Sequence, residues 1–297
     1  MKNFTSKLGI APINWCNDDM PDLGKDYSLH TCFTEMREAG YQGTELGHKF
    51  PQEPHKLKKL LDSYQLHLAS AWHSTYFCDA KKHDSEHQRL EERLKFLQIM
   101  GTTCINLAEC TYTIHNKIDV PLNKKPHLSS TEWGLVSQGL EEASVMCHEY
   151  GITPAYHNHM GTVIQDFDEI KRLMEDCPSL KLCFDSGHLQ FAGIDPIKIL
   201  DLFSGRIGHV HLKDIRKSVF EKLTQTSFLE AVLAGVFTVP GDGCIDFSSI
   251  LAKLHTMKYN AWIIVEAEQD PSKAEPFAYA CKSYKYLQKN FLALQAT

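Results

Sequence analysis

The sequence has no excess of positive charge and no cysteine spacing typical of a small disulfide-stabilised domain. Of its 297 residues, 31 are Lys or Arg and 37 are Asp or Glu, which gives a net charge of −6 with neutral histidine. A protein that grips nucleic acid needs a basic face for the phosphates, so this balance speaks against a nucleic-acid partner. The ten cysteines include no Cys-x-x-Cys pair, and such scattered thiols are typical of a reducing compartment.

Long apolar runs and nucleotide-binding loops are also missing. No stretch approaches the roughly 20 apolar residues that cross a bilayer, so we expect no membrane partner. The segment from Met1 to Trp15 is interrupted by Pro12 and Asn14 and does not resemble a signal peptide. The stretch 241–243 lacks the strand and helix that flank a phosphate-binding loop. We therefore expect a cytoplasmic protein, and the sequence leaves open whether it is a homo-oligomer.

Short β-rich runs alternate with longer amphipathic segments along the whole chain, which indicates β/α units and a parallel sheet. Eight strands are expected, at residues 8–15, 43–47, 66–72, 104–108, 152–157, 180–185, 207–212 and 262–266. Helices are expected at 29–39, 86–100 and 132–150, each followed by a glycine that ends it. The pattern predicts a single (β/α)8 TIM barrel over residues 1–297, with an excursion at 214–246 over the barrel mouth.

Polar residues gather where the predicted strands end, which is the face that carries the active site in a TIM barrel. Imidazoles and carboxylates together form a mixed nitrogen and oxygen set that suits Mn, Co, Fe or Zn. Side chains two apart on a strand point to the same side, so each His-x-His pair shares a face. The residues concerned are Glu45, His73, Glu109, His157, His159, Asp185, His188, His209, His211, Lys213 and Glu266.

Each of these signals also has a plainer interpretation. A His-x-His pair alone is more often structural, and Asp185 alone could form an Asx turn. Glu266 is harder to explain this way, because a carboxylate that ends the apolar strand 262–265 must be solvated, paired or bound to metal. The joint occurrence of the signals favours a metal site.

Two tryptophans stand at expected strand ends, Trp15 and Trp72. They are either core residues or a flat wall against which the C–H face of a sugar or cyclitol ring packs. Lys213 is either a salt-bridged lysine or a group that polarises a substrate oxygen.

The strand-end motifs at 156–159, 184–188, 209–214 and 265–266 resemble the xylose isomerase-like barrel superfamily, and this resemblance spans nearly the whole chain. Segments 13–21, 43–47, 71–74 and 108–111 resemble a narrower family, the inosose dehydratases of myo-inositol catabolism. The resemblance implies a lyase that removes water from 2-keto-myo-inositol with divalent Mn or Co. It also links the activity with glutathione, for which these residues show no site.

Carried over by resemblance, the metal ligands are His157, Asp185, His211 and Glu266. The superfamily usually has glutamate where this sequence has His157, so Glu109 or His159 are alternatives for that ligand. For the reaction we expect Glu266 or Glu109 as the base and His73, His159 or Lys213 as the acid. The predicted substrate contacts are Asn14, Trp15, Glu45, Trp72 and His188.

Three other functions fit parts of this pattern. A ketose 3-epimerase or isomerase would share enolate formation at a metal and differ only in the fate of the enolate. An abasic-site endonuclease would need several zinc ions and a basic surface, which the net charge disfavours. A non-catalytic cyclitol-binding protein would bind the metal without turnover.

Overall fold

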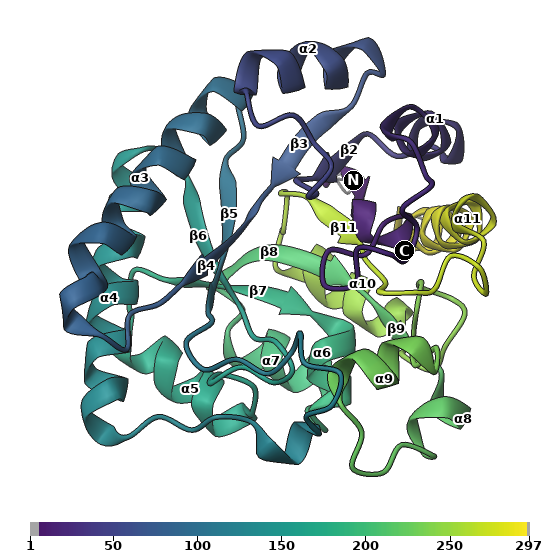
Figure 1. The fold of residues 1–297 in the computed structure, drawn as a ribbon. Helices are drawn as coiled ribbons and strands as arrows, with labels where there is room; N and C mark the ends of the chain where they lie inside the picture. Colours follow the sequence, from purple (N-terminus) through teal and green to yellow (C-terminus); the bar gives the residue numbers. More distant parts are fainter. Residues whose placement is uncertain (1–5, 296–297) are drawn as a thin grey trace.

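The computed structural model describes residues 6–295 and consists of a ring of strands surrounded by helices (Figure 1). Residues 1–5 and 296–297, the ends of the predicted domain, lie outside the described residues. The strands of the main sheet are β1 (Leu8–Ile10), β2 (Gly43–Glu45), β3 (His67–Ser70), β4 (Trp72–Thr75), β5 (Cys104–Glu109), β6 (Thr153–His157), β7 (Lys181–Asp185), β8 (Ile207–Leu212) and β11 (Ile263–Val265).

These nine strands form one sheet in the order β3-β2-β1-β11-β8-β7-β6-β5-β4, and every pairing is parallel. The third predicted strand is divided at Ala71 into β3, which pairs with β2, and β4, which pairs with β5. Because β3 and β4 follow each other along the chain, the two ends of the sheet meet there. The predicted TIM barrel is confirmed, and it closes at this seam between β3 and β4.

Helices cover the outside of the ring (Figure 1). The α-helices that connect the strands of the main sheet are α1 (Leu29–Ala39), α2 (Pro54–Ser63), α3 (His83–Met100), α4 (Ser130–Glu149), α5 (Phe167–Asp176), α6 (Ser186–Phe191), α7 (Pro196–Leu202) and α10 (Phe247–Thr256), and α11 (Pro276–Gln295) follows β11. Short 3-10 helices are η1 (Pro12–Asn14), η2 (Ala80–Lys82) and η3 (Leu122–Lys124). The predicted stops are present: Gly40 and Gly101 cap α1 and α3 in the left-handed region, at φ 109° and 74°.

The predicted excursion leaves the barrel after β8. It contains β9 (Asp214–Ile215), α8 (Lys217–Phe220), α9 (Phe228–Leu233) and β10 (Phe237–Thr238). β9 and β10 pair antiparallel as a separate two-stranded sheet with α8 and α9 beside it (Figure 1), and Phe228 of α9 packs against His159 and His188 at the strand ends. The carboxylate of Asp214 accepts backbone N–H groups of Gly241, Gly243 and Ile245, which fixes the turn that returns the chain to α10.

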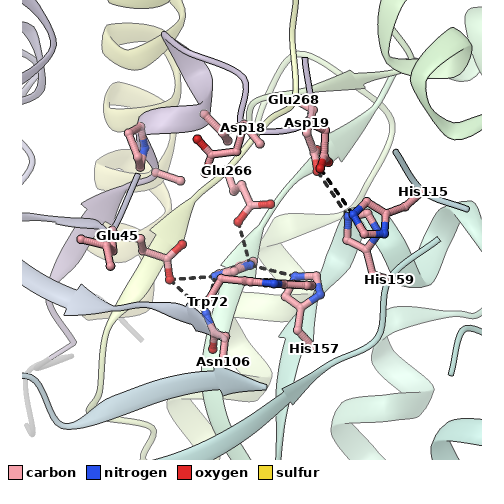
Figure 2. Close-up of a pocket in the computed structure, with 15 residues that line it drawn as sticks. Asp18, Asp19, Glu45, Trp72, Asn106, His115, His157, His159, Glu266 and Glu268 are labelled. Atoms are coloured by element: carbon pink, nitrogen blue, oxygen red, sulfur yellow. Dashed lines mark hydrogen bonds and ion pairs between the residues drawn. The ribbon is translucent and has the colours of Figure 1, made fainter. Parts of the chain in front are cut away.

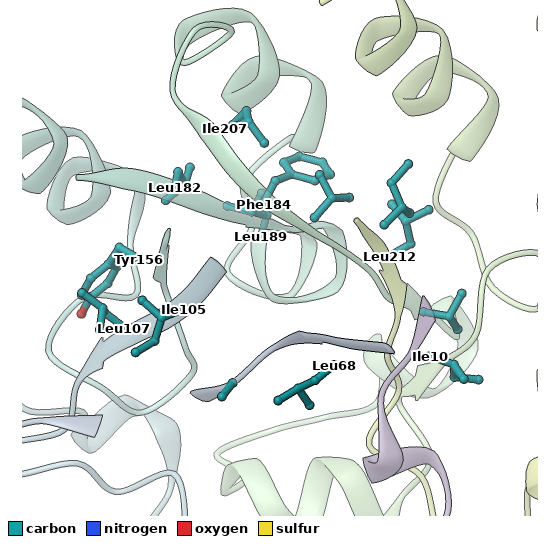
Figure 3. Packing of buried hydrophobic residues seen from close by; sticks show 14 of the residues in the cluster. Ile10, Leu68, Ile105, Leu107, Tyr156, Leu182, Phe184, Leu189, Ile207 and Leu212 are labelled. Atoms are coloured by element: carbon teal, nitrogen blue, oxygen red, sulfur yellow. The ribbon is translucent and has the colours of Figure 1, made fainter. Parts of the chain in front are cut away.

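Alternation along the strands decides which side chains reach the barrel interior. In β5, Ile105 and Leu107 point outward into the apolar layer between strands and helices (Figure 3). The interior beneath the mouth is filled by the small side chains of Cys104, Ala155 and Cys183. All ten cysteines are free and eight are buried, as predicted from their spacing.

The first predicted strand, 8–15, is wrong in its second half. Only Leu8–Ile10 is a strand, because Pro12 has no N–H for a ladder and opens η1 instead. Trp15 therefore does not stand at a strand end. Its ring lies in the apolar core, and Nε1 donates to Glu35 of α1. Among the described residues no helix is both long and apolar enough to cross a membrane.

Candidate active site

A cavity of about 170 Å³ opens at the end of the barrel where the strand-end residues gather. This is below the roughly 300–1,000 Å³ of pockets for drug-sized ligands, so it suits a small molecule. The lining residues are Ala11, Pro12, Ile13, Asp18, Asp19, Glu45, Leu46, Trp72, Asn106, His115, His157, His159, His211, Glu266 and Glu268, and Figure 2 shows most of their side chains converging.

Four predicted ligands lie together at this cavity: His157, His211 and Glu266 line it, and Asp185, which does not line it, lies against them. His211 Nδ1 lies 2.8 Å from Glu266 Oε2, 3.1 Å from His157 Nε2 and 3.6 Å from Asp185 Oδ2. One ligand atom from each of the four residues lies within 4.8 Å of the others, and all four side chains are buried. The residues come from β6, β7 and β8 and from the position after β11, so the parallel sheet itself brings them together.

This cluster fits a divalent cation on its own chemistry. Asp185 Oδ2 and His157 Nδ1 are buried without a hydrogen-bond partner among the described residues. Lys213 Nζ lies 3.4 Å from Asp185 Oδ2 without a hydrogen bond to it, and a cation bound among the four side chains would satisfy this oxygen directly. Two carboxylates and two imidazoles form the mixed donor set that Mn, Co, Fe and Zn favour over Mg or Ca.

Glu45 holds one member of the cluster from behind. Glu45 Oε1 lies 3.0 Å from His211 Nε2 and 2.9 Å from His209 Nε2, and it also accepts from Asn106 Nδ2. A carboxylate that receives the far N–H of a histidine fixes the ring and leaves its other nitrogen free for a metal. The pKa of Glu45 is lowered, because both imidazoles outweigh the effect of burial. Glu45 lines the pocket, but these contacts commit its carboxylate to positioning His211.

Lys213 is fully buried below the cluster rather than exposed to the cavity. Its ammonium lies 2.8 Å from Glu266 Oε1, 2.6 Å from Glu268 Oε2 and 3.4 Å from Asp185 Oδ2. Although burial alone would lower the pKa of Lys213, these carboxylates raise it well above its usual value. A Cβ added at Gly187 would lie 2.5 Å from Lys213 Cγ, so the absence of a side chain at Gly187 makes room for the stem of Lys213.

His159 lines the cavity beside the cluster, as expected for a catalytic residue. Its Nδ1 lies 3.0 Å from the carbonyl oxygen of Met160, which can only accept a hydrogen bond. Nδ1 therefore carries the proton and donates it. The pKa of His159 is well below its usual value because of burial and the neighbouring His188, His115 and His157. His159 is thus a neutral imidazole whose Nε2 carries a lone pair.

Of the two tryptophans predicted to form an aromatic wall, Trp72 lines the cavity and Trp15 does not. The Trp72 ring meets His157 and His159 edge to face, at centroid distances of 5.3 and 5.8 Å, and Nε1 donates to Ser74. Asn14 and His188 do not line the cavity. Asn14 is buried and accepts from Ala267 N, while His188 Nε2 lies 2.9 Å from Lys213 Nζ.

Two predicted catalytic residues are placed elsewhere, which corrects that expectation. The predicted third strand was expected to end at Trp72, but β4 begins there and continues to Thr75. His73 is therefore a strand residue, and because it follows Trp72 directly, its side chain points to the opposite face, away from the barrel interior. It lines a separate cavity with Arg89 and Arg93, and burial together with these two charges lowers its pKa to about 3.

Glu109 is also out of phase, since it follows Ile105 and Leu107 on the outward face of β5. It is fully buried and absent from the lining of the active-site cavity. Its oxygens accept from Phe77 N, Thr75 Oγ1 and Thr111 N, each at 3.0 Å. Glu109 therefore anchors the loops after β4 and β5, and the expected roles as base or alternative ligand are withdrawn.

Several lining residues were not identified from the sequence: Asp18, Asp19, Asn106 and His115. Asp18 and Asp19 lie in the loop between β1 and α1, within the segment 13–21 used for the resemblance. His115 lies in the long segment between β5 and α4. The available signal was the length of that segment, because the βα loops of a TIM barrel build its active-site face.

A family model described as the xylose isomerase-like TIM barrel matches residues 33–289, and the chain belongs to this family. Its fold is similar to that of a solved L-ribulose 3-epimerase, with a TM-score of 0.69 and 13% identity over 98% of this chain and 96% of the other. A structure titled IOLI protein with a binding zinc atom matches with a TM-score of 0.66 and 14% identity, covering 97% of each chain.

Relatives of higher sequence identity assign the chain to a narrower family within this one. The chain is 44% identical over 288 residues to the inosose dehydratase of Clostridium beijerinckii, covering 95% of this chain and 96% of that protein. It is 44% identical over 292 residues to the inosose dehydratase of Lacticaseibacillus casei strain BL23, with 97% of each chain covered. At this identity over nearly the full length of both, the chain belongs with the inosose dehydratases.

Proposed function

We propose that this protein is a metal-dependent hydro-lyase that removes water from 2-keto-myo-inositol in myo-inositol catabolism. The observation that carries the proposal is the buried set of His157, Asp185, His211 and Glu266 at a small cavity. The inosose dehydratases related to the chain over nearly its full length support the same reaction.

In this proposal those four residues hold the cation, with Mn or Co as the ion. The ion, when bound, supplies Lewis-acid polarisation of the substrate ketone and so makes the neighbouring C–H group acidic. Glu45 keeps the Nδ1 lone pair of His211 directed at the cluster, and Lys213 keeps Glu266 and Asp185 close together. Lys213 thus acts as a positioning residue, because an ammonium with three carboxylate partners is a poor proton donor.

His159 is the proposed base for the proton next to the ketone. Its Nδ1–H donates to Met160 O, so the lone pair of Nε2 is free to accept a proton. Glu266, the other expected base, has both oxygens engaged by His211 and Lys213. The expected role of His159 as an acid is therefore reversed. Trp72 supplies the apolar wall for the C–H face of the ring.

The remaining expectations belong to the same proposal. We place the enzyme in the cytoplasm as a single domain over 1–297, acting on a small cyclitol and without a nucleic-acid partner; a homo-oligomer stays an open prediction. Glutathione rests on the family resemblance alone. Turnover measured with and without added glutathione tests that dependence.

The proposed function is tested by removing and restoring the cation. Protein stripped with a chelator and dialysed should lose turnover of 2-keto-myo-inositol, and Mn or Co should restore it more fully than Mg. Mass spectrometry should find a product lighter by one water. A product of unchanged mass would identify an epimerase or isomerase instead, and full turnover by the stripped protein would remove the metal from the reaction. Bound metal without turnover of any ketocyclitol would indicate a binding protein.

A further inference from the structure

The cavity has a second wall, opposite the metal cluster, that two loops build. Asp19 comes from the loop between β1 and α1, and His115 comes from the segment between β5 and α4. Figure 2 shows the His115 ring beside that of His159 and close to Asp19. His115 Nε2 lies 3.4 Å from Asp19 Oδ1, and the two side chains are 14% and 24% exposed. Both are therefore largely buried yet open to the cavity.

Thr113 contacts the first ring nitrogen of His115. Thr113 Oγ1 lies 2.5 Å from His115 Nδ1 and 3.2 Å from the carbonyl oxygen of Gly161, and it accepts the backbone N–H of His115 at 3.4 Å. The single hydroxyl hydrogen can be donated either to Gly161 O or to His115 Nδ1, so this contact suits both a proton and a lone pair at Nδ1.

The other ring nitrogen of His115 faces an acceptor. Nε2 lies against the carboxylate of Asp19, which accepts protons and donates none when ionised. A ring nitrogen that faces a carboxylate carries a hydrogen, so Nε2 is the donor nitrogen of His115. The third neighbour is the ring of His159, whose centroid is 5.1 Å away. The surroundings of His115 thus keep an N–H group beside the proposed base.

The neighbouring His159 has the opposite arrangement. Its Nδ1–H donates to Met160 O. The carboxylate oxygen nearest to Nε2 is Glu268 Oε1, which is 3.9 Å away and so beyond hydrogen-bond distance. The two neighbouring imidazoles therefore offer different groups at Nε2, a lone pair on His159 and an N–H on His115. Such a pair is what an elimination of water requires.

We propose that His115 is the general acid that protonates the departing β-hydroxyl, and that Asp19 is its positioning residue. The proposal rests on the proposed dehydratase function and assigns the second proton transfer of that reaction. His159 Nε2 accepts the proton from the carbon next to the ketone, and the C–H electron pair forms the double bond of an enolate, with the negative charge on the former ketone oxygen. The enolate then reforms the ketone, its electron pair forms the new carbon–carbon double bond, and the β C–O bond breaks with its electron pair on oxygen, which takes the proton from His115 Nε2. Water leaves, and the enol product rearranges to the dione.

The test separates proton removal from water loss in His115→Asn. The substrate is incubated in D2O, and the recovered ketone and the product are analysed by mass spectrometry. Water loss should fall about 10²- to 10⁴-fold, the usual contribution of a general acid. Deuterium should still enter the recovered ketone at a rate within about threefold of proton removal by the wild type. Asp19→Asn should show the same separation with a smaller loss.

Three controls keep the outcome interpretable. His127→Asn makes the same change at an exposed histidine of the same connecting segment and should leave both rates unchanged. The metal content and melting temperature of His115→Asn should match those of the wild type. If His115→Asn unfolds, His115→Gln replaces it. A substrate analogue with β-fluoride in place of the hydroxyl should be eliminated by His115→Asn at close to the wild-type rate, because fluoride leaves without needing a proton.

The outcomes distinguish this proposal from the one on which it rests. Wild-type protein that neither exchanges nor dehydrates the ketone would overturn the proposed function. Wild-type dehydration that persists in His115→Asn, or a variant that loses exchange and dehydration equally, would overturn only the assignment of His115.

Discussion

Two carboxylates of the barrel are buried to the same extent and have opposite surroundings. Asp185, at the centre of the mouth, has one oxygen with no hydrogen-bond partner among the described residues and two imidazoles near it. Glu109, on the flank of the barrel, has N–H and O–H donors on both oxygens. The comparison teaches that burial alone does not identify a functional carboxylate; the partners of its oxygens do.

The largest effect should follow from Asp185→Asn. The amide cannot supply the ligand charge, so metal binding should be lost together with several kcal/mol of transition-state stabilisation. Since roughly 1.4 kcal/mol corresponds to tenfold, turnover should fall by about a thousandfold or more. Metal analysis and a rate measurement test this, with the exposed Asp168→Asn as the matched control. If Asp185→Asn kept the metal content of the wild type, Asp185 would not be a metal ligand, and its unpartnered oxygen would not mark a functional carboxylate.

An intermediate effect should follow from Glu45→Gln, because Glu45 contacts a proposed ligand rather than the cation. Without the carboxylate, His211 loses the partner that orients its ring. Metal affinity should fall by about 10- to 100-fold, in line with other residues that support metal-bound histidines. A metal titration compares this variant with the exposed Glu38→Gln. Unchanged affinity would mean that His211 is held in place by its remaining contacts.

Glu109→Gln should affect stability and leave the chemistry intact. The new amide NH2 would replace one oxygen and face either the donors of Thr75 and Phe77 or that of Thr111, so about 1–3 kcal/mol of unfolding free energy should be lost. Turnover per folded molecule should stay within about threefold of the wild type. Denaturant unfolding and steady-state rates measure the two quantities separately. A hundredfold loss of turnover at unchanged stability would return Glu109 to the mechanism.

The smallest effect concerns Asp242, a carboxylate at the base of the excursion. Burial alone would raise its pKa, but Lys282, Thr238 and Arg216 lower it. A carboxylate whose folded-state pKa is lowered stabilises the protein above its unfolded pKa of about 3.9 and loses this contribution as the pH falls further. Asp242→Asn should therefore cost about 1 kcal/mol at neutral pH and nothing in strong acid. Urea unfolding at several pH values tests this; an equal cost at every pH would exclude the charge as its cause.

The fold could be predicted because it follows from strand periodicity. His157, Asp185 and His211 occupy inward positions near the ends of consecutive strands, so a correct strand assignment places them together, while their role as ligands rests on the family resemblance. The same periodicity shows why His73 and Glu109 do not reach the mouth, since each lies on the outward face of its strand.

The loop wall could not be predicted in this way. Asp19 and His115 lie in segments without a repeating pattern, where tertiary contacts decide which side chain reaches the cavity. Trp15 shows the same limit, since one proline before it redirected the chain from the sheet to the core. Long segments after barrel strands therefore need to be searched for site residues even when they carry no motif.

Lys213 gives the mouth of the barrel a cation that is part of the chain. Its carbon stem passes close to Gly187, and its buried ammonium bridges three carboxylates that would otherwise repel one another. A site with this internal counter-charge does not depend on the metal to keep its walls together. We therefore expect the stripped protein to remain folded and to recover its ion reversibly, so that supply of the metal can govern activity without endangering the fold.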